Sequence, residues 1–344
     1  MYSKVYGEGG VLLVGDTHYS DVFTGKHKNY LENSCWVLAR IREKVEEIRP
    51  AALVILGDIV GVYDRNVRNR EVLSLLCKFF KDVNKICKVY CIRGNHDFGD
   101  YPDYQFLADL GMFETAVSTG GYFDYFAHEG DEVAEVRFHL MDYGTEGKEL
   151  DLAPQGVSNV VLAHNNFTIQ GVTTWYPDKD GIELGIMSNM TGVDMVVSGH
   201  IHNPSPEIVA TNMVGGGTCA LFYTGSPARP VKEKGLYESC WFVQFKYDIT
   251  SKSTMYDALE FPLRPLNEVF YDNEELIEEK TEEELEELKR TAELKEVLDD
   301  ILKCRMTSGD LLGQVNNIPN ASESAKKVAC NYLQMALDGK SQGK

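Results

Sequence analysis

The 344-residue sequence lacks any apolar run that approaches the roughly 20 residues a membrane helix requires. Its first apolar stretch, VLLV at 11–14, leads directly into polar residues, so we expect no signal peptide. The eight cysteines are scattered without a CxxC pair, which argues against a zinc ribbon or a disulfide framework. We therefore expect a soluble cytoplasmic protein with no membrane association.

Basic residues are also scarce, with 34 Lys and Arg against 53 Asp and Glu and a formal net charge of −19. Residues 272–300 hold fourteen acidic and four basic side chains, a net charge of −10. Residues 301–344 carry +3, which leaves −12 for residues 1–271. A basic footprint is the usual sign of a nucleic-acid binder, so this balance weighs against unaided DNA binding.

Short β-rich runs alternate with helical patterns up to about residue 250, which indicates an α/β domain of layered sheets and helices. Continuous apolar runs of this kind suggest strands that are buried on both faces. The predicted strands lie within 11–16, 52–58, 88–95, 135–144, 159–164, 195–200, 221–226 and 239–248. Helices are predicted over 36–48 and 72–86 from apolar residues at three- and four-residue spacing. In the second helix Leu73, Leu76, Phe79 and Phe80 are consistent with either a buried face or a dimer interface.

The chain changes character at Pro262 and Pro265, which predicts a first domain over 1–260 and a C-terminal region over 261–344. A capping box at Thr281–Glu284 begins one predicted helix of that region, and another begins near Ser322 and ends near Gly339. The apolar face of this last helix could cap its own domain or dock onto a partner.

Five short motifs follow predicted strands: GDTH (15–18), GD (57–58), GNHD (94–97), AH (163–164) and GHIH (199–202). Open α/β sheets present ligands at the carboxyl ends of their strands. One Asp or His at a strand end is usually structural, but five such sites in this order are not expected by chance. The motifs contribute nine candidate residues: Asp16, His18, Asp58, Asn95, His96, Asp97, His164, His200 and His202.

These residue types suit metal-dependent phosphoryl chemistry. Imidazole, carboxylate and amide oxygen together favour borderline divalent ions such as Mn, Fe or Zn. Two ions about 3.5–4 Å apart can clamp a phosphoryl transfer, with one carboxylate bridging them and a metal-bound hydroxide as nucleophile. A further histidine that is not a ligand would contact the phosphate or protonate the leaving oxygen. Glycine precedes four of the motifs' ligands, which permits tight turns and close backbone approach.

As an ordered set over residues 11–202, the motifs resemble the calcineurin-like metallophosphoesterase superfamily. The resemblance implies an α/β (α+β) fold: a four-layer β-sandwich flanked by helices, here with a C-terminal helical extension. It also implies a role for each residue. Asp16, His18 and His202 would bind one ion, Asn95, His164 and His200 would bind the other, and Asp58 would bridge them. His96 would be the catalytic histidine, oriented by Asp97.

A narrower resemblance takes in most of the chain. FYTGSPARP (222–230) resembles the GS loop of SbcD-type DNA nucleases, and the closing LLGQVNNIPNASESAKKVACNYLQMA resembles the C-terminal helices of their bacteriophage members. It implies a DNA exonuclease or endonuclease subunit for recombination and repair, with two ions that are expected to be Mn (alternatives Mg, Fe or Zn). The C-terminal helices would bind an SbcC-type coiled-coil ATPase. The protein would form a homodimer, and a phage-encoded protein would act in the host cytoplasm.

The sequence departs from that subfamily after the GD motif, where SbcD-type enzymes often carry a histidine. Tyr63, Asp64 and Arg65 are the nearest polar residues here. The segment that would form a DNA-capping domain is also short. The alternative is a metallophosphatase or phosphodiesterase for a small molecule or phosphoprotein, and a non-catalytic scaffold would require missing ligands. His128 and His139 lie outside every motif and are expected to be loop and core residues.

Overall fold

The computed structural model describes residues 3–20, 27, 30–61, 70–98, 103–169, 181–205, 207–230, 238–248, 250–251 and 253–269. All of these belong to the first of two units into which the chain divides, Met1–Asp272 and Asn273–Lys344. The predicted C-terminal helices and the capping box lie outside the described residues, as do Tyr63, Asp64 and Arg65.

A five-stranded sheet has the order β14-β13-β2-β3-β4. Its strands are β2 (Val11–Val14), β3 (Ala52–Ile55), β4 (Lys88–Cys91), β13 (Ser239–Asp248) and β14 (Ser253–Pro262). β2, β3 and β4 are parallel, and β13 runs antiparallel to both β2 and β14. The short apolar runs in β2 and β3 are fully buried, as expected for parallel strands that are covered on both faces.

A seven-stranded sheet has the order β1-β5-β6-β7-β10-β12-β11. Its strands are β1 (Ser3–Tyr6), β5 (Tyr122–Phe126), β6 (Val136–Met141), β7 (Ser158–His164), β10 (Met195–Gly199), β11 (Val209–Asn212) and β12 (Thr218–Tyr223). The central strands β6, β7, β10 and β12 are parallel. Their carboxyl ends therefore share one edge of the sheet.

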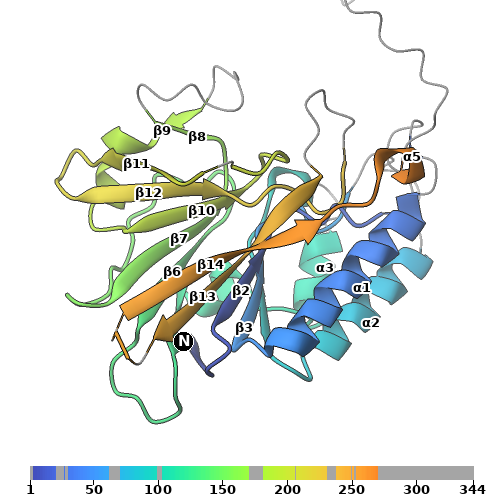
Figure 1. Ribbon diagram of the computed structural model, residues 1–344, viewed down its shortest axis with the longest axis horizontal. Helices are drawn as coiled ribbons and strands as arrows, with labels where there is room; N and C mark the ends of the chain where they lie inside the picture. The colour runs from blue at the N-terminus through green and yellow to red at the C-terminus, as the bar shows by residue number, and fades with distance from the viewer. Residues whose placement is uncertain are drawn as a thin grey trace, which may run out of the picture. The chain divides into compact units, whose positions relative to one another are not determined.

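Three helices cover one face of the five-stranded sheet: α1 (Tyr30–Ile48), α2 (Arg70–Val83) and α3 (Asp103–Asp109) (Figure 1). Leu76, Phe79 and Phe80 of α2 are buried in this layer, as the buried-face alternative expects, whereas Leu73 is half-buried. The shorter helices are α4 (Ala116–Thr119) and α5 (Leu266–Val269). Among the described residues, none of the helices combines the length and the apolar character that crossing a membrane would need.

Successive side chains of β2 point to opposite faces of the five-stranded sheet and so belong to two different core layers. Leu12 and Val14 pack with the helices, whereas Val11 and Leu13 pack with the residues of the second sheet. The outer face of the seven-stranded sheet is covered by short segments: β8 (Phe167–Thr168), β9 (Ile182–Glu183) and the 3₁₀ turns η2 (Leu184–Ile186) and η3 (Ser188–Met190). The predicted sandwich fold is confirmed, with helices on one outer face and these short segments on the other.

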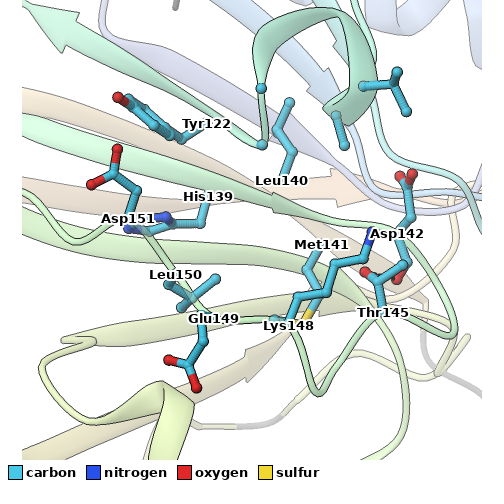
Figure 2. A pocket seen from close by; sticks show the side chains of 14 residues that line it. Tyr122, His139, Leu140, Met141, Asp142, Thr145, Lys148, Glu149, Leu150 and Asp151 are labelled. Carbon is cyan, nitrogen blue, oxygen red and sulfur yellow. Dashed lines mark hydrogen bonds between the residues drawn. The ribbon is translucent and has the colours of Figure 1, made fainter.

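The predicted strands and both predicted helices are present, although α2 ends at Val83 rather than at residue 86. Sequence reasoning missed β1, β5, β11 and β14, whose polar residues interrupt the apolar pattern, and the two-residue strands β8 and β9. His139 on β6 is buried, as predicted, and its Nε2 lies 3.0 Å from Asn159 Oδ1. It borders a surface pocket that Tyr122, Leu140 and Asp151 also line (Figure 2).

Candidate metal centre

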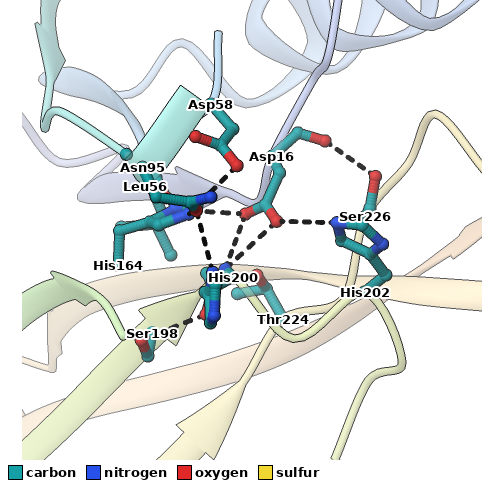
Figure 3. Close-up of polar contacts among 12 residues, drawn as sticks. Asp16, Leu56, Asp58, Asn95, His164, Ser198, His200, His202, Thr224 and Ser226 are labelled. Atoms are coloured by element: carbon teal, nitrogen blue, oxygen red, sulfur yellow. Dashed lines mark hydrogen bonds and ion pairs between the residues drawn. The ribbon is translucent and has the colours of Figure 1, made fainter. Parts of the chain in front are cut away.

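The five motifs lie at the carboxyl ends of β2, β3, β4, β7 and β10, and AH forms the last two residues of β7. Three of these strands belong to the five-stranded sheet and two to the seven-stranded sheet, so both sheets contribute side chains to the same place. Figure 3 shows Asp16 between the side chains of this site, with His164 and Asn95 on one side and His202 on the other. The structure therefore brings together motifs that span almost 190 residues of sequence.

A first group of donor atoms consists of Asp16, His18 and His202. Asp16 Oδ2 lies 4.0 Å from His18 Nε2 and 3.7 Å from His202 Nε2, and the two imidazole nitrogens are 3.2 Å apart. Burial lowers the pKa of His18 to about 4 and that of His202 well below its usual value. Both imidazoles are therefore neutral near pH 7, which is the form that binds metal ions.

A second group surrounds His164. Asn95 Oδ1 lies 3.0 Å from both His164 Nε2 and His200 Nδ1. His164 Nδ1 lies 2.7 Å from the carbonyl oxygen of Leu56, which can only accept a hydrogen bond. Nδ1 therefore carries a proton, and Nε2 is directed at the other donors, as a backbone carbonyl commonly arranges for metal-binding histidines.

Asp58 lies between the two groups. Its Oδ2 is 3.1 Å from His164 Nε2 and 3.7 Å from His18 Nε2. Its Oδ1 accepts a hydrogen bond of 2.8 Å from the backbone N–H of His96. Burial would raise the pKa of this carboxyl, but His164 and His18 outweigh that effect and hold the pKa well below its usual value.

The charges of this donor set fit a cation. Asp16 and Asp58 are both almost fully buried, and burial raises the pKa of Asp16 to about 7. Burial lowers the pKa of His164, but the two carboxylates reverse this and raise it to about 9. The proton that His164 gains in this way offsets the buried negative charge, and a divalent ion would offset the same charge more fully. Asp16, Asp58 and His164 also place one donor atom each within 4.8 Å of one another.

Three of the candidate residues adopt the left-handed backbone conformation, with φ of 41° at His18, 45° at Asp58 and 74° at His200. Residues other than glycine rarely adopt it, and such strain tends to be kept at functional sites. Hydrogen bonds hold these residues in place: His18 N–H donates to Asp58 O, and His200 N–H donates to both carboxylate oxygens of Asp16.

Glycines make room for the ligands of neighbouring motifs. A Cβ atom at Gly57, whose φ is 88°, would overlap the imidazole of His164. A Cβ atom at Gly199 would overlap Asp16 Oδ1 and the carbonyl oxygen of Leu56. The glycine of one motif therefore permits the close approach of a ligand from another.

His96 lies beside the donor groups, with its ring 5.5 Å from that of His18. It is half-buried, whereas Asp97 is buried. The Asp97 carboxylate accepts hydrogen bonds from Gly94 N–H (2.8 Å) and Ile59 N–H (3.2 Å). Asp97 thus joins the GNHD loop to the GD loop, and its predicted effect on His96 would act through the position of this loop.

Sequence reasoning missed several residues that support the ligands. Ser226 Oγ of the GS loop donates to Asp16 O (2.8 Å), and Ser226 N–H donates to His202 O (2.9 Å). Tyr30 Oη donates to His18 O (3.0 Å). Ser226 is the serine of the GS loop FYTGSPARP, so the resemblance of that loop could have indicated it. Tyr30 belongs to no motif.

The model of the Calcineurin-like phosphoesterase family matches residues 10–204 of the chain. This range includes all nine candidate residues but ends before the GS loop. Among solved structures, a dimetal phosphatase from Danio rerio is 12% identical, with a TM-score of 0.43, and the match covers 74% of this chain and 99% of that one.

Proposed function

Because the chain belongs to the calcineurin-like phosphoesterase family, we propose that its motif residues hold two divalent ions for the hydrolysis of a phosphodiester. Asp16, His18 and His202 would bind one ion. Asn95, His164 and His200 would bind the other, with Asp58 between the two. The observation that carries this proposal is the position of Asp58, whose Oδ2 faces His164 and His18 at 3.1 and 3.7 Å.

When bound, two such ions would supply positive charge to the phosphate and lower the pKa of a water molecule. The protein residues prepare the site for them. Neutral His18 and His202 offer lone pairs, and the Leu56 carbonyl fixes the ring of His164. His96 adjoins the donor groups without belonging to either, so it is placed to contact the phosphate or to protonate the leaving oxygen.

We further infer that the phosphodiester is DNA and that the chain is the nuclease subunit of an SbcCD-like recombination and repair complex. The resemblance of FYTGSPARP and of the C-terminal segment to bacteriophage SbcD-type proteins supports this inference. In the structure the GS loop packs against two candidate ligands through Ser226. The net charge of −12 over residues 1–271 disfavours unaided DNA binding, which is consistent with a need for metal ions and an ATPase partner.

The decisive experiment is a nuclease assay of the full chain on linear duplex DNA with Mn, Mg, Fe or Zn, with and without a candidate SbcC-type ATPase. We expect Mn-dependent degradation that the ATPase stimulates. Deleting residues 281–344 should abolish ATPase binding in a pull-down assay while hydrolysis of bis(p-nitrophenyl) phosphate persists. Hydrolysis confined to small phosphoesters, with no ATPase binding, would instead identify a metallophosphatase or a small-molecule phosphodiesterase.

A further inference from the structure

Two exposed aromatic rings lie at the rim of the metal centre. The ring centroid of Tyr143 is 6.1 Å from that of His200 and 6.5 Å from that of His164. Phe98 contacts Tyr143 with the ring centroids 6.4 Å apart and the planes inclined by 63°. The exposed fractions are 38% for Tyr143 and 48% for Phe98. The pair forms a small apolar corner beside a group of buried polar side chains.

Hydrogen bonds connect Tyr143 to the loops that carry the candidate ligands. Tyr143 N–H donates to Arg93 O, and Arg93 N–H donates to Asp142 Oδ1, both at 2.8 Å. This links the loop after β6 to the loop that carries Asn95. Glu146 lies farther along the loop after β6, and its Oε1 accepts a hydrogen bond from the side-chain amide of Asn165. Asn165 directly follows His164 in the sequence. The position of Tyr143 is therefore set by the same framework that sets the metal donors.

Phe98 also contacts the guanidinium of Arg93. The guanidinium carbon of Arg93 lies 5.1 Å from the ring centroid of Phe98 and 5.0 Å from that of Tyr104. The same guanidinium donates to Gln105 Oε1 through Nη2 at 2.8 Å. A cation over one aromatic face is favourable and leaves the exposed part of the Phe98 ring available for contact.

We propose that Phe98 and Tyr143 form a stacking surface for the nucleobase attached to the phosphate that is cleaved. This inference rests on the proposed hydrolysis of a phosphodiester and names the chemical class of its substituent. If a phosphate is held near His164 and His200, a base that one sugar joins to it can reach the ring of Tyr143. Sugars and phosphates offer no π face, whereas a base gains about 1–3 kcal/mol from stacking on an aromatic side chain.

The geometry also indicates how the base would lie. Phe98 and Tyr143 already contact each other, so a base rests over the corner that they form and does not enter between them. At an inclination of 63°, a planar group that stacks on one ring meets the other nearly edge to face. Both arrangements are favourable for aromatic pairs. Stacking of this kind accepts every base, so no sequence preference is expected from it.

Calorimetry on the metal-loaded full chain tests this surface with two probes that share a phosphate, thymidine 5′-monophosphate and 2-deoxyribose 5-phosphate. We expect the nucleotide to bind about tenfold more tightly, within the roughly 5- to 150-fold range that base stacking allows. The combined variant Phe98→Ala, Tyr143→Ala should bring the two affinities together. Phe98→Tyr and Tyr143→Phe should keep the difference, because each retains a ring.

Phe106→Ala and Tyr256→Ala are matched controls, since these side chains are 43% and 44% exposed and belong to α3 and β14. Neither should change the ratio of the two affinities. Equal affinities in the wild type, or a ratio that survives in the combined variant, would overturn the stacking surface. Hydrolysis of bis(p-nitrophenyl) phosphate is measured separately. Its absence would refute the proposed hydrolysis, whereas the affinity ratio reports only on the stacking surface.

Discussion

The two ring nitrogens of His164 have different partners, which no sequence motif could indicate. Nδ1 is directed at the Leu56 carbonyl, and Nε2 faces both Asp58 and Asn95. An imidazole with these partners is oriented before a metal ion arrives. At the scale of single residues, the proposal therefore depends most directly on this side chain.

Replacing His164 by alanine should lower the bound transition metal from close to two ions per chain towards one. The change removes one metal donor and also the imidazole that faces the Asp58 carboxylate. Elemental analysis of purified protein after dialysis measures the loss. His128→Ala is the matched control, because the side chain of this histidine is 40% exposed and lies outside the site. An unchanged metal content in His164→Ala would refute its assignment as a ligand.

His96 should separate catalysis from metal binding. It adjoins the donor groups without belonging to either, so His96→Ala should retain both ions. Loss of a general acid or a phosphate contact typically lowers turnover by about 10²–10⁴-fold. Elemental analysis together with initial rates on bis(p-nitrophenyl) phosphate tests both expectations. Full activity, or loss of an ion, would assign His96 a different role.

At the scale of elements, the loops at the strand ends depend on one another. Asp97 ties the GNHD loop to the GD loop, and Ser226 ties the GS loop to the loop that follows β2. The positive φ angles of His18, Asp58 and His200 are consistent with loops that are shaped for the site and not for their own stability. A substitution in one loop should therefore shift the position of a candidate ligand in another loop.

Gly57→Ala tests this dependence. The new Cβ atom would displace the imidazole of His164, so we expect metal affinity to fall at least tenfold. Gly156→Ala is the matched control: its φ of 96° resembles the 88° of Gly57, but no atom lies within 4 Å of the added Cβ. Both variants should lose about 1–2 kcal/mol of stability, because a Cβ atom is disfavoured in this left-handed backbone conformation. Equal metal affinities in the two variants would contradict the steric argument.

At the scale of the whole molecule, the metal-free protein should lose stability as the pH rises from 7 to 9. The folded-state pKa values of Asp16, Asp97 and His164 are raised to about 7, 8 and 9. For the two carboxyls the main cause is burial, and for His164 the neighbouring carboxylates outweigh burial. A group with a raised pKa binds more protons when folded, so its favourable contribution is lost as the pH passes through the folded value.

Bound metal should remove most of this pH dependence, because the ions replace the protons that offset the buried carboxylates. Urea unfolding at pH 7 and pH 9, with and without chelator, measures the difference. We expect the loss of unfolding free energy between pH 7 and pH 9 to be on the order of 1–3 kcal/mol larger in the metal-free protein. A metal-free protein that becomes relatively more stable at pH 9 would contradict the sign.

The sequence alone determined the residue types of the candidate site and their places at strand ends. Apolar runs that are buried on both faces mark strands locally. GDTH follows β2 directly, two residues separate GNHD from β4, and GHIH begins at the last residue of β10. It also indicated a layered α/β core, because alternation and helical spacing are short-range patterns. The interrupted pattern of β14 concealed that strand, which pairs with β13 along its full length.

Only the tertiary structure decided which atoms face each other. Ser226 and Asp16 are 210 residues apart in the sequence, and no local pattern pairs a hydroxyl with a particular carbonyl over that distance. The same applies to the corner of Phe98 and Tyr143, which follow different strands in different sheets. Chemistry that depends on residue type can be read along the chain, whereas distances between loops arise only when the sheets pack and their strand ends meet.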